Sequence, residues 1–365
     1  MRHPGRHRRG AIGAIVLVAL MLTGCVAGSG ADGEIGATTP RLAEVTTIAD
    51  PGGYVGSSSA RVASTPIVPL GDGVQLLPAT VTDTQGDVVT VTDTSRILAL
   101  DLYGSLSRIV FELGLGDSVV GRDVSSDFEE ISDRELVTQN GHDLNAEAIL
   151  NLAPTLIITD SSLGPWDTIL QMRDAGISVV VVSSERSIDS IPVLVDQVAA
   201  AVGLVERGTV LSSRISAEVD NTVAAIAAIA PADPAEKLRM VFLYVRGQAG
   251  VYYMFGEGSG ADDLVNSLGG IDVSSEIGWA GMRPITDEGI IAAAPDVILM
   301  MTKGLESVGG VDGLFEHLPA LAQTPAGEHR RIVDMSDTQI LSFGPATSLT
   351  LEALAVAIYA PEDAK

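Results

Sequence analysis

Two residues of this sequence, His142 and Tyr244, carry side chains that could together bind a metal ion, and Arg246 lies two residues after the tyrosine. His142 lies in the stretch NGHDLNAEAILNLAP, with no second histidine, cysteine or acid at a usual metal-ligand spacing. A single loop histidine is most often an incidental surface residue. Any role as a ligand therefore depends on what the fold places opposite it.

Tyr244 and Arg246 lie near the end of the strand-like run LRMVFLYVR, two residues apart. Alternate residues of a strand share one face, so we expect both side chains on the same side. A guanidinium beside a phenol favours the charged phenolate form. A phenolate is a hard ligand that suits ferric iron. Tyr252 and Tyr253 are rival phenolates in the nearby run GVYYMFG, and Met254 is a softer ligand; the sequence ranks all three below Tyr244.

The N-terminus predicts export and lipid attachment. Residues 2–9 hold four arginines, the apolar run AIGAIVLVALML is short for a membrane span, and LTGC follows at residues 22–25. This pattern is typical of a bacterial lipoprotein signal peptide. We expect residues 1–24 to be removed and Cys25, the only cysteine, to carry acyl chains such as palmitate on the extracytoplasmic face of the cell membrane. A secretory signal with a chance cysteine is the alternative.

Cleavage would leave an acidic protein. Without the four arginines of residues 1–24, 18 basic residues remain against 47 acidic ones, a net charge of −29. Such a field repels nucleic acid, which is excluded as a partner, and an anionic ligand would need locally placed arginines.

The rest of the chain divides into a tether, two lobes and a helical connection. Residues 25–86 are rich in Gly, Ser, Thr, Ala and Pro and predict a flexible tether. Strand-like and helix-like runs alternate in 87–186 and again in 230–365, which predicts two α/β lobes with mainly parallel sheets. Residues 187–229 have almost no strand signal and predict one long helix or two abutting ones, with glycines at 203 and 208 as weak points. The apolar spacing there is too irregular for a coiled coil.

An internal repeat relates the two lobes. The stretch NAEAILNLAPTLIIT aligns without gaps on TDEGIIAAAPDVILM at an offset of 141 residues. Glu147 corresponds to Glu288 and Pro154 to Pro295, and three residues before the repeated stretch His142 corresponds to Arg283. We therefore expect pseudo-twofold lobes whose equivalent loops face one cleft.

These repeated stretches, with LVNSLGGIDV before the second and the lipoprotein signal in front, resemble the substrate-binding lipoproteins of siderophore, cobalamin and haem ABC importers. The resemblance covers roughly residues 90–360. It implies a class III periplasmic-binding-protein fold, in which a long rigid helix joins two Rossmann-like lobes and the ligand lies between them. The implied partners are an ABC permease and its ATPase.

A histidine in the first lobe and Tyr-x-Arg in the second resemble, in particular, the haem-binding lipoproteins of actinobacterial haem importers. The resemblance implies that His142 and Tyr244 are the axial ligands of a transported ferric haem b and that Arg246 holds the tyrosine. Arg283 is the first candidate for the haem propionates. Other pocket candidates are Arg96, Arg122, Trp166 and Trp279, and Asp127, Glu129, Glu130, Asp272 and Glu276 are candidates for docking to the permease.

Other classes of function fit the sequence less well. A ferric-siderophore or corrinoid binder is the main alternative, held by arginine and aromatic contacts without iron–protein bonds. A bare zinc or manganese site needs several converging histidines and acids, and the mature chain has only His142, His317 and His329. The sequence contains no G-x-S-x-G, P-loop, H-E-x-x-H or C-x-x-C motif, so an enzyme is not expected.

Overall fold

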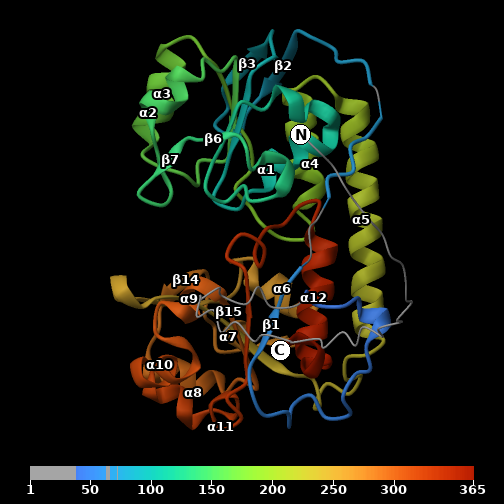
Figure 1. The fold of residues 1–365 in the computed structure, drawn as a ribbon, viewed down its shortest axis with the longest axis vertical. Coiled ribbons are helices and arrows are strands. Elements are labelled where there is room, and N and C mark those ends of the chain that lie inside the picture. Colours follow the sequence, from blue (N-terminus) through green and yellow to red (C-terminus); the bar gives the residue numbers. More distant parts are fainter. Residues whose placement is uncertain (1–37, 63–65, 72) are drawn as a thin grey trace, which may run out of the picture. The chain divides into compact units, whose positions relative to one another are not determined.

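The computed structural model describes residues 38–62, 66–71 and 73–365. The predicted signal peptide and Cys25 lie outside these residues. Two α/β lobes occupy the described chain (Figure 1), and the predicted fold class is confirmed.

Lobe one is built on three parallel strands in the order β10–β9–β4. Leu156 of β9 pairs with Ile97 of β4 on one side and Ser178 of β10 on the other. Nearly every residue of these strands is buried, as expected where helices cover both faces of a parallel sheet. The bounds are β2 Ala79–Thr82, β3 Val88–Val91, β4 Ile97–Leu100, α1 Ser105–Val110, β5 Gly121–Arg122, β6 Glu135–Leu136, β7 Thr138–Gln139, β8 Asp143–Leu144, α2 Ala146–Asn151, β9 Leu156–Thr159, α3 Trp166–Asp174 and β10 Ser178–Val181.

Lobe two contains a seven-stranded sheet in the order β1–β16–β15–β11–β12–β14, with β13 also paired to β11. The strands around β11 and β15 are parallel, whereas β12 and β14 add an antiparallel edge. The bounds are β1 Ser58–Ala60, β11 Arg239–Arg246, β12 Val251–Phe255, α6 Ala261–Ser267, β13 Ile271–Asp272, α7 Val273–Glu276, β14 Met282–Pro284, α8 Asp287–Ala293, β15 Val297–Met301, α9 Thr302–Glu306, α10 Gly310–His317, α11 Pro325–Glu328, β16 Ile332–Met335 and α12 Thr347–Tyr359.

The prediction of a tether through residue 86 is wrong for the segment that contains β1. This strand pairs with β16 in parallel, Ser58 opposite Val333, and completes the edge of the lobe-two sheet. The Ser58 hydroxyl donates to the Ala357 carbonyl at 2.7 Å. Backbone pairing does not depend on side-chain type, so a composition of small polar residues fits an edge strand as well as a tether.

Two abutting helices connect the lobes. α4 (Ile191–Ala201) packs on lobe one, and α5 (Val205–Ala227) contacts α12 of lobe two; Figure 1 shows α5 running past both lobes. The break falls at Gly203, one of the two predicted weak points, which has a φ of 69°. Gly208 instead stays helical. A Cβ at this position would lie 2.4 Å from that of Ala199, so the glycine allows the two helices to pack closely. At 23 residues, α5 is about 35 Å long.

The internal repeat is visible in the local structure. α2 and α8 begin 141 residues apart, and so do β9 and β15. Asn145 and Thr286 each cap their helix by accepting a hydrogen bond from the amide three residues on. Ala153 and Ala294 each take a left-handed backbone conformation before the proline. The two units therefore share caps and turns as well as sequence.

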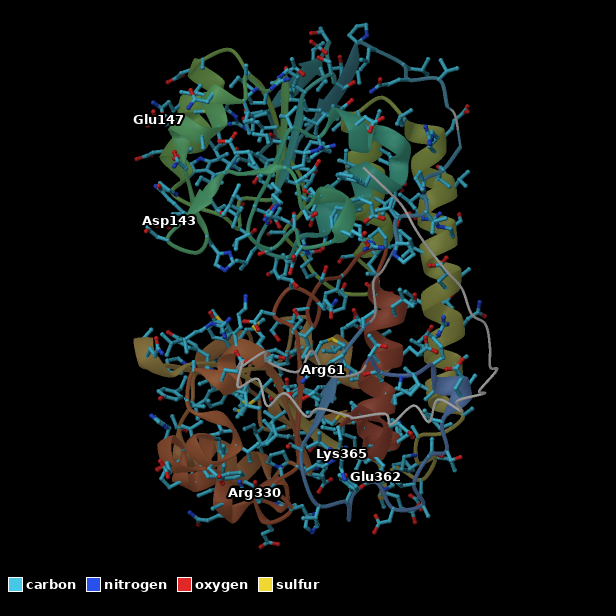
Figure 2. The ribbon with its side chains drawn as sticks, in the orientation of Figure 1. Arg61, Asp143, Glu147, Arg330, Glu362 and Lys365 are labelled. Carbon is cyan, nitrogen blue, oxygen red and sulfur yellow. The ribbon has the colours of Figure 1, made fainter. Side chains whose placement is uncertain are left out.

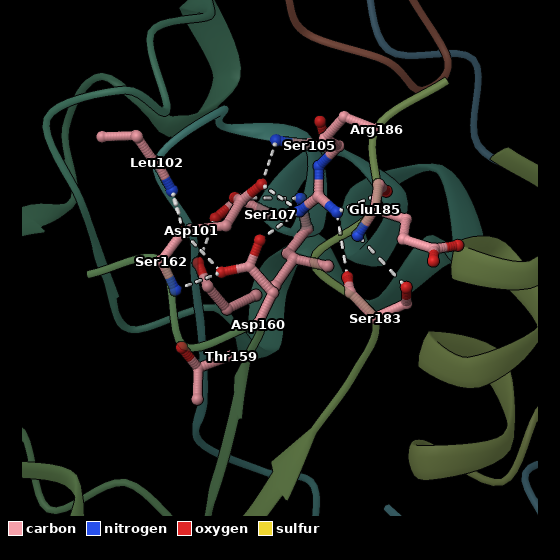
Figure 3. Close-up of polar contacts among 12 residues, drawn as sticks. Asp101, Leu102, Ser105, Ser107, Thr159, Asp160, Ser162, Ser183, Glu185 and Arg186 are labelled. Atoms are coloured by element: carbon pink, nitrogen blue, oxygen red, sulfur yellow. Dashed lines mark hydrogen bonds and ion pairs between the residues drawn. The ribbon is translucent and has the colours of Figure 1, made fainter. Parts of the chain in front are cut away.

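A buried ionic cluster closes the carboxyl edge of the lobe-one sheet (Figure 3). Asp101 follows β4, Asp160 follows β9, and both carboxylates accept hydrogen bonds from Arg186, which follows β10. A third acid, Asp123, accepts the Asp101 amide at 3.1 Å and is fully buried without a cation of its own. Burial, opposed by Arg186, raises the pKa of Asp101 to about 6. Burial and the charge of Asp101 raise the pKa of Asp123 to about 7.

These shifts predict that the cluster destabilises the fold as pH rises. Asp123 binds its proton more tightly in the folded than in the unfolded state, so its contribution is complete below about pH 4 and is lost as pH rises through about 7. Asp123→Asn removes this loss. The difference in free energy of unfolding between the variant and the wild type should therefore shift in favour of the variant by a few kcal/mol between pH 5 and pH 8. Urea unfolding at both values measures this, with the exposed Asp133→Asn as control. Equal pH slopes in wild type and Asp123→Asn would contradict the prediction.

Candidate functional site

Tyr244 and Arg246 share one face near the end of β11. The Arg246 guanidinium carbon lies 4.5 Å from the centroid of the Tyr244 ring. The ring is half-buried and stacks on Phe255 of β12, with centroids 6.1 Å apart. No hydrogen bond engages the Tyr244 hydroxyl within the described part of the chain. The phenol is therefore held by its ring and its oxygen is free to bind a ligand.

Arg246 is anchored by groups on its own strand and on neighbouring elements. Its Nη1 donates to the Val245 carbonyl at 2.9 Å, and its Nη2 donates to Asp337 Oδ1 at 2.5 Å. The Met301 sulfur lies 3.6 Å from the same nitrogen. Asp337 was missed by the sequence reasoning. The signal that could have found it is its position two residues after β16, at the carboxyl edge of a strand parallel to its neighbours.

His142 is carried by the tight hairpin β7–β8. Gln139 pairs with Asp143, and the loop between them contains Asn140 and Gly141, both with positive φ. The hairpin is fixed to the body of lobe one, because the Leu144 amide donates to the Gly164 carbonyl at 2.5 Å. Figure 2 places Asp143 at the edge of lobe one that faces lobe two. The hairpin thus presents His142 at an exposed tip on a rigid base.

Charges of lobe two act on His142. The pKa of its imidazole is lowered from 6.5, first by desolvation and then by the positive charges of Arg246 and Lys303. Asp143 and Asp337 oppose this shift. His142 is therefore within electrostatic reach of the Tyr244–Arg246 end of β11. A lowered pKa keeps the imidazole neutral, the form that binds metals. Sequence reasoning missed Lys303, which carries no signal beyond its position after β15.

The register of the sheet separates the rival phenolates. Tyr253 pairs with Tyr244 across the β11–β12 ladder, so both lie on one face. Tyr252 lies on the opposite face, where it stacks on His317 with centroids 6.2 Å apart. Met254 is on that opposite face too and is fully buried. Only Tyr253 remains beside Tyr244 among these candidates.

The same register does not bring Arg283 to Tyr244. Arg283 pairs with Met254 of β12, so its side chain starts from the face opposite Tyr244. Met282 and Pro284 take the Tyr244 face of β14 instead. The repeat aligned Arg283 with His142 correctly along the chain. The antiparallel strand β12, which the repeat does not contain, decides which way the residue points.

The remaining pocket candidates are engaged within their own lobes. Trp279 donates to the Met254 carbonyl at 2.9 Å and packs in the lobe-two core. Trp166 packs in the lobe-one core beneath Arg173. Arg96 precedes β4 and donates to the Leu152 and Ala153 carbonyls, at the end of the sheet opposite its carboxyl edge. Arg122 lies nearer the carboxyl edge, 3.4 Å from the Asp123 and Ser126 carbonyls.

The predicted docking acids also have different surroundings. Glu129 is exposed, and Glu130 accepts the Ile67 amide at 2.9 Å. Glu276 pairs with Arg239 at 2.8 Å, at the start of β11 and so at the opposite end of the strand from Tyr244. Asp272 caps α7 and is buried. In lobe two, Asp272 is thus buried and Glu276 has an ion-pair partner, and the docking role of these acids stays a prediction.

The chain is similar to known proteins over most of its length. The family model described as periplasmic binding protein matches residues 102–338, more than half of the chain. The chain belongs to the periplasmic binding protein family. Its predicted membership is thereby confirmed. No helix among the described residues has the length and apolar character needed to cross a membrane.

Individual relatives of this periplasmic binding protein agree with the family. The crystal structure of heme binding protein HmuT is 43% identical and has a TM-score of 0.79, covering 85% of this chain and 99% of its own. Solved HmuT variants substitute a histidine, a tyrosine and an arginine, the last two separated by one residue. Periplasmic heme-binding protein RhuT from Roseiflexus sp. RS-1 is 36% identical with a TM-score of 0.64, covering 75% of this chain and 100% of its own. The uncharacterized ABC transporter substrate-binding lipoprotein YvrC of Bacillus subtilis (strain 168) is 24% identical, covering 78% of this chain and 87% of its own.

The electrostatic coupling of the lobes predicts the titration of His142. In the ligand-free protein its imidazole should titrate below 6.5, and both Lys303→Met and Arg246→Met should raise the pKa, because each removes a positive charge that disfavours the imidazolium. NMR titration of the histidine ring protons measures the shift. Arg239→Met, at the far end of β11, is the control and should leave His142 unchanged. A pKa insensitive to both charge removals would show that the lobes do not face each other at this site.

Proposed function

We propose that this protein is an extracytoplasmic haem-binding lipoprotein, which captures ferric haem b between its lobes and delivers it to an ABC importer. The observation that carries the proposal is that Arg246 of lobe two, whose guanidinium lies over the Tyr244 ring, also acts through its charge on His142 of lobe one and lowers the pKa of that imidazole. The HmuT variants support it. The histidine, tyrosine and arginine substituted there are the same residue types as His142, Tyr244 and Arg246, and the tyrosine and arginine have the same Tyr-x-Arg spacing. Its role is binding and transfer rather than catalysis.

Each ligand has the chemistry that a ferric haem requires. A neutral imidazole offers the lone pair that binds iron on one side of the porphyrin. The Tyr244 hydroxyl, which makes no hydrogen bond within the described residues, becomes a phenolate ligand on the other side. Arg246 stabilises that negative oxygen through its positive charge. Lys303 supplies a cation for a propionate in place of Arg283.

Exposed apolar side chains on both lobes suit contact with a porphyrin. Leu102 follows Asp101 at the carboxyl edge of lobe one, and Leu136 lies in β6 close to the β7–β8 hairpin in sequence. Met282 lies on the Tyr244 face of lobe two and is 55% exposed. Large apolar side chains left in water at a site gain free energy when a flat hydrophobic ligand covers them.

Membrane attachment and docking complete the proposal. Cys25 carries the lipid anchor on the extracytoplasmic face of the cell membrane, a role supported by the LTGC sequence. The exposed Glu129, with Glu130 beside it, is the candidate for contact between lobe one and the permease.

Hemin titration of the mature protein tests the axial ligands. We expect a ferric Soret band and a phenolate-to-iron charge-transfer band, with Tyr244→Phe abolishing the latter and His142→Ala shifting the former. Each substitution should weaken affinity by about tenfold or more, the scale at which changes around a metal site act. Tyr253→Phe and Tyr252→Phe are matched controls on the same and the opposite sheet face, and should retain the charge-transfer band.

The same titration separates the alternative ligands. Spectra unaffected by both Tyr244→Phe and His142→Ala would refute the axial pair. Saturable binding of a ferric siderophore or a corrinoid, without binding of hemin, would replace haem as the ligand while keeping the importer role.

The lipid anchor predicts where the protein is found. Cys25→Ala in the full-length precursor should move the protein from the membrane fraction to the soluble extracytoplasmic fraction and abolish labelling with a radioactive fatty acid, because no other thiol exists. Fractionation and labelling measure both effects. Retention of label in the variant would contradict attachment at this cysteine.

A further inference from the structure

We propose that Asp337 is a positioning residue that holds Arg246 against the ring of Tyr244, so that three residues rather than two set the tyrosine ligand. This inference rests on the proposed function of Tyr244 as a haem ligand. It gives a role to an acid that neither the sequence motif nor the repeat contains.

The contacts of Arg246 identify Asp337 as its main anchor. The guanidinium lies 4.5 Å from the Tyr244 ring centroid, and its ion pair with Asp337 has a length of 2.5 Å. Its other oxygen partner is the Val245 carbonyl, which belongs to the preceding residue on the same strand. A long flexible side chain is not fixed by its own neighbour alone. Asp337 is the charged group that ties it to another element.

Asp337 is itself fixed, which a positioning residue requires. Its Oδ2 accepts a hydrogen bond from the Lys303 amide at 3.0 Å, at the start of α9. Its side chain is 13% exposed and that of Arg246 is 29% exposed. An ion pair that is partly shielded from water and has a second hydrogen bond holds geometry better than an exposed surface pair. The carboxylate, which follows β16, therefore links the end of β11 to the start of α9.

The ion pair between Asp337 and Arg246 has a consequence for iron binding. With Asp337 in place, the positive charge of Arg246 stays over the tyrosine, where it stabilises an iron-bound phenolate. Without it, the guanidinium gains access to water and to other rotamers, so the ligand oxygen loses this support. Asp337 acts on the tyrosine ligand through Arg246, which makes the effects of the two residues on that ligand non-additive.

A double-mutant cycle with hemin tests the proposal. Asp337→Ala, Arg246→Ala and the double variant are compared by hemin affinity and by the phenolate-to-iron charge-transfer band. We expect Asp337→Ala to weaken affinity by about three- to thirtyfold and to shift the band in the same direction as Arg246→Ala. The double variant should be no weaker than Arg246→Ala. Asp312→Ala, which removes a surface carboxylate paired with Arg330 in the same lobe, is the control and should behave as wild type.

The outcomes distinguish this inference from the proposed function. Losses that add in the double variant would overturn it, as would an unchanged band in Asp337→Ala while Tyr244→Phe abolishes the band. Failure of wild-type protein to bind hemin would instead refute the proposed function. Asp337→Asn covers the case in which Asp337→Ala does not fold: it keeps an oxygen for the Lys303 amide but removes the charge, and it too should weaken binding. Wild-type affinity and band in Asp337→Asn would overturn the inference.

Discussion

The ion pairs of Arg186 fix the turn that leads from lobe one into the helical connection between the lobes. Arg186 reaches back to Asp101 and Asp160 at the ends of two lobe-one strands, while two residues later the Ile188 amide donates to Asp263 at the start of α6. One short turn is thus fastened to both lobes before α4 begins. A buried arginine is costly to desolvate, so losing both carboxylates would leave its charge unpaired.

The lobes descend from one structural unit but use it differently. Both have the same capped helix, left-handed alanine and buried strand at an offset of 141 residues. Lobe one adds a hairpin that presents His142 from its tip. Lobe two inserts the antiparallel strand β12 between β11 and β14, and it carries Tyr244 near the end of β11. A pseudo-symmetric scaffold thereby carries two chemically different side chains, His142 in one lobe and Tyr244 in the other.

Much of this arrangement could be predicted from the sequence, because it depends on local periodicity. The alternation of strands and helices, the repeat, the break at Gly203 and the shared face of Tyr244 and Arg246 are all consequences of spacing. What could not be predicted depends on pairing between distant segments. The orientation of Arg283 follows from the β12–β14 register, and the anchor on Arg246 comes from Asp337, 91 residues away. Small polar residues at 58–60 gave no sign of a partner strand.

The pairing of β1 with β16 also fixes an order in which the chain can fold. The sheet of lobe one uses strands from Ile97 to Val181, so all of it is available once the first half of the chain has emerged. The sheet of lobe two joins Ser58 to Val333 and cannot be completed until nearly the last residue is made. Lobe two therefore combines the first and last described strands of the chain, a non-local closure that slows folding. A chain truncated near its C-terminus would retain the segment that carries His142 but not a complete sheet around Tyr244.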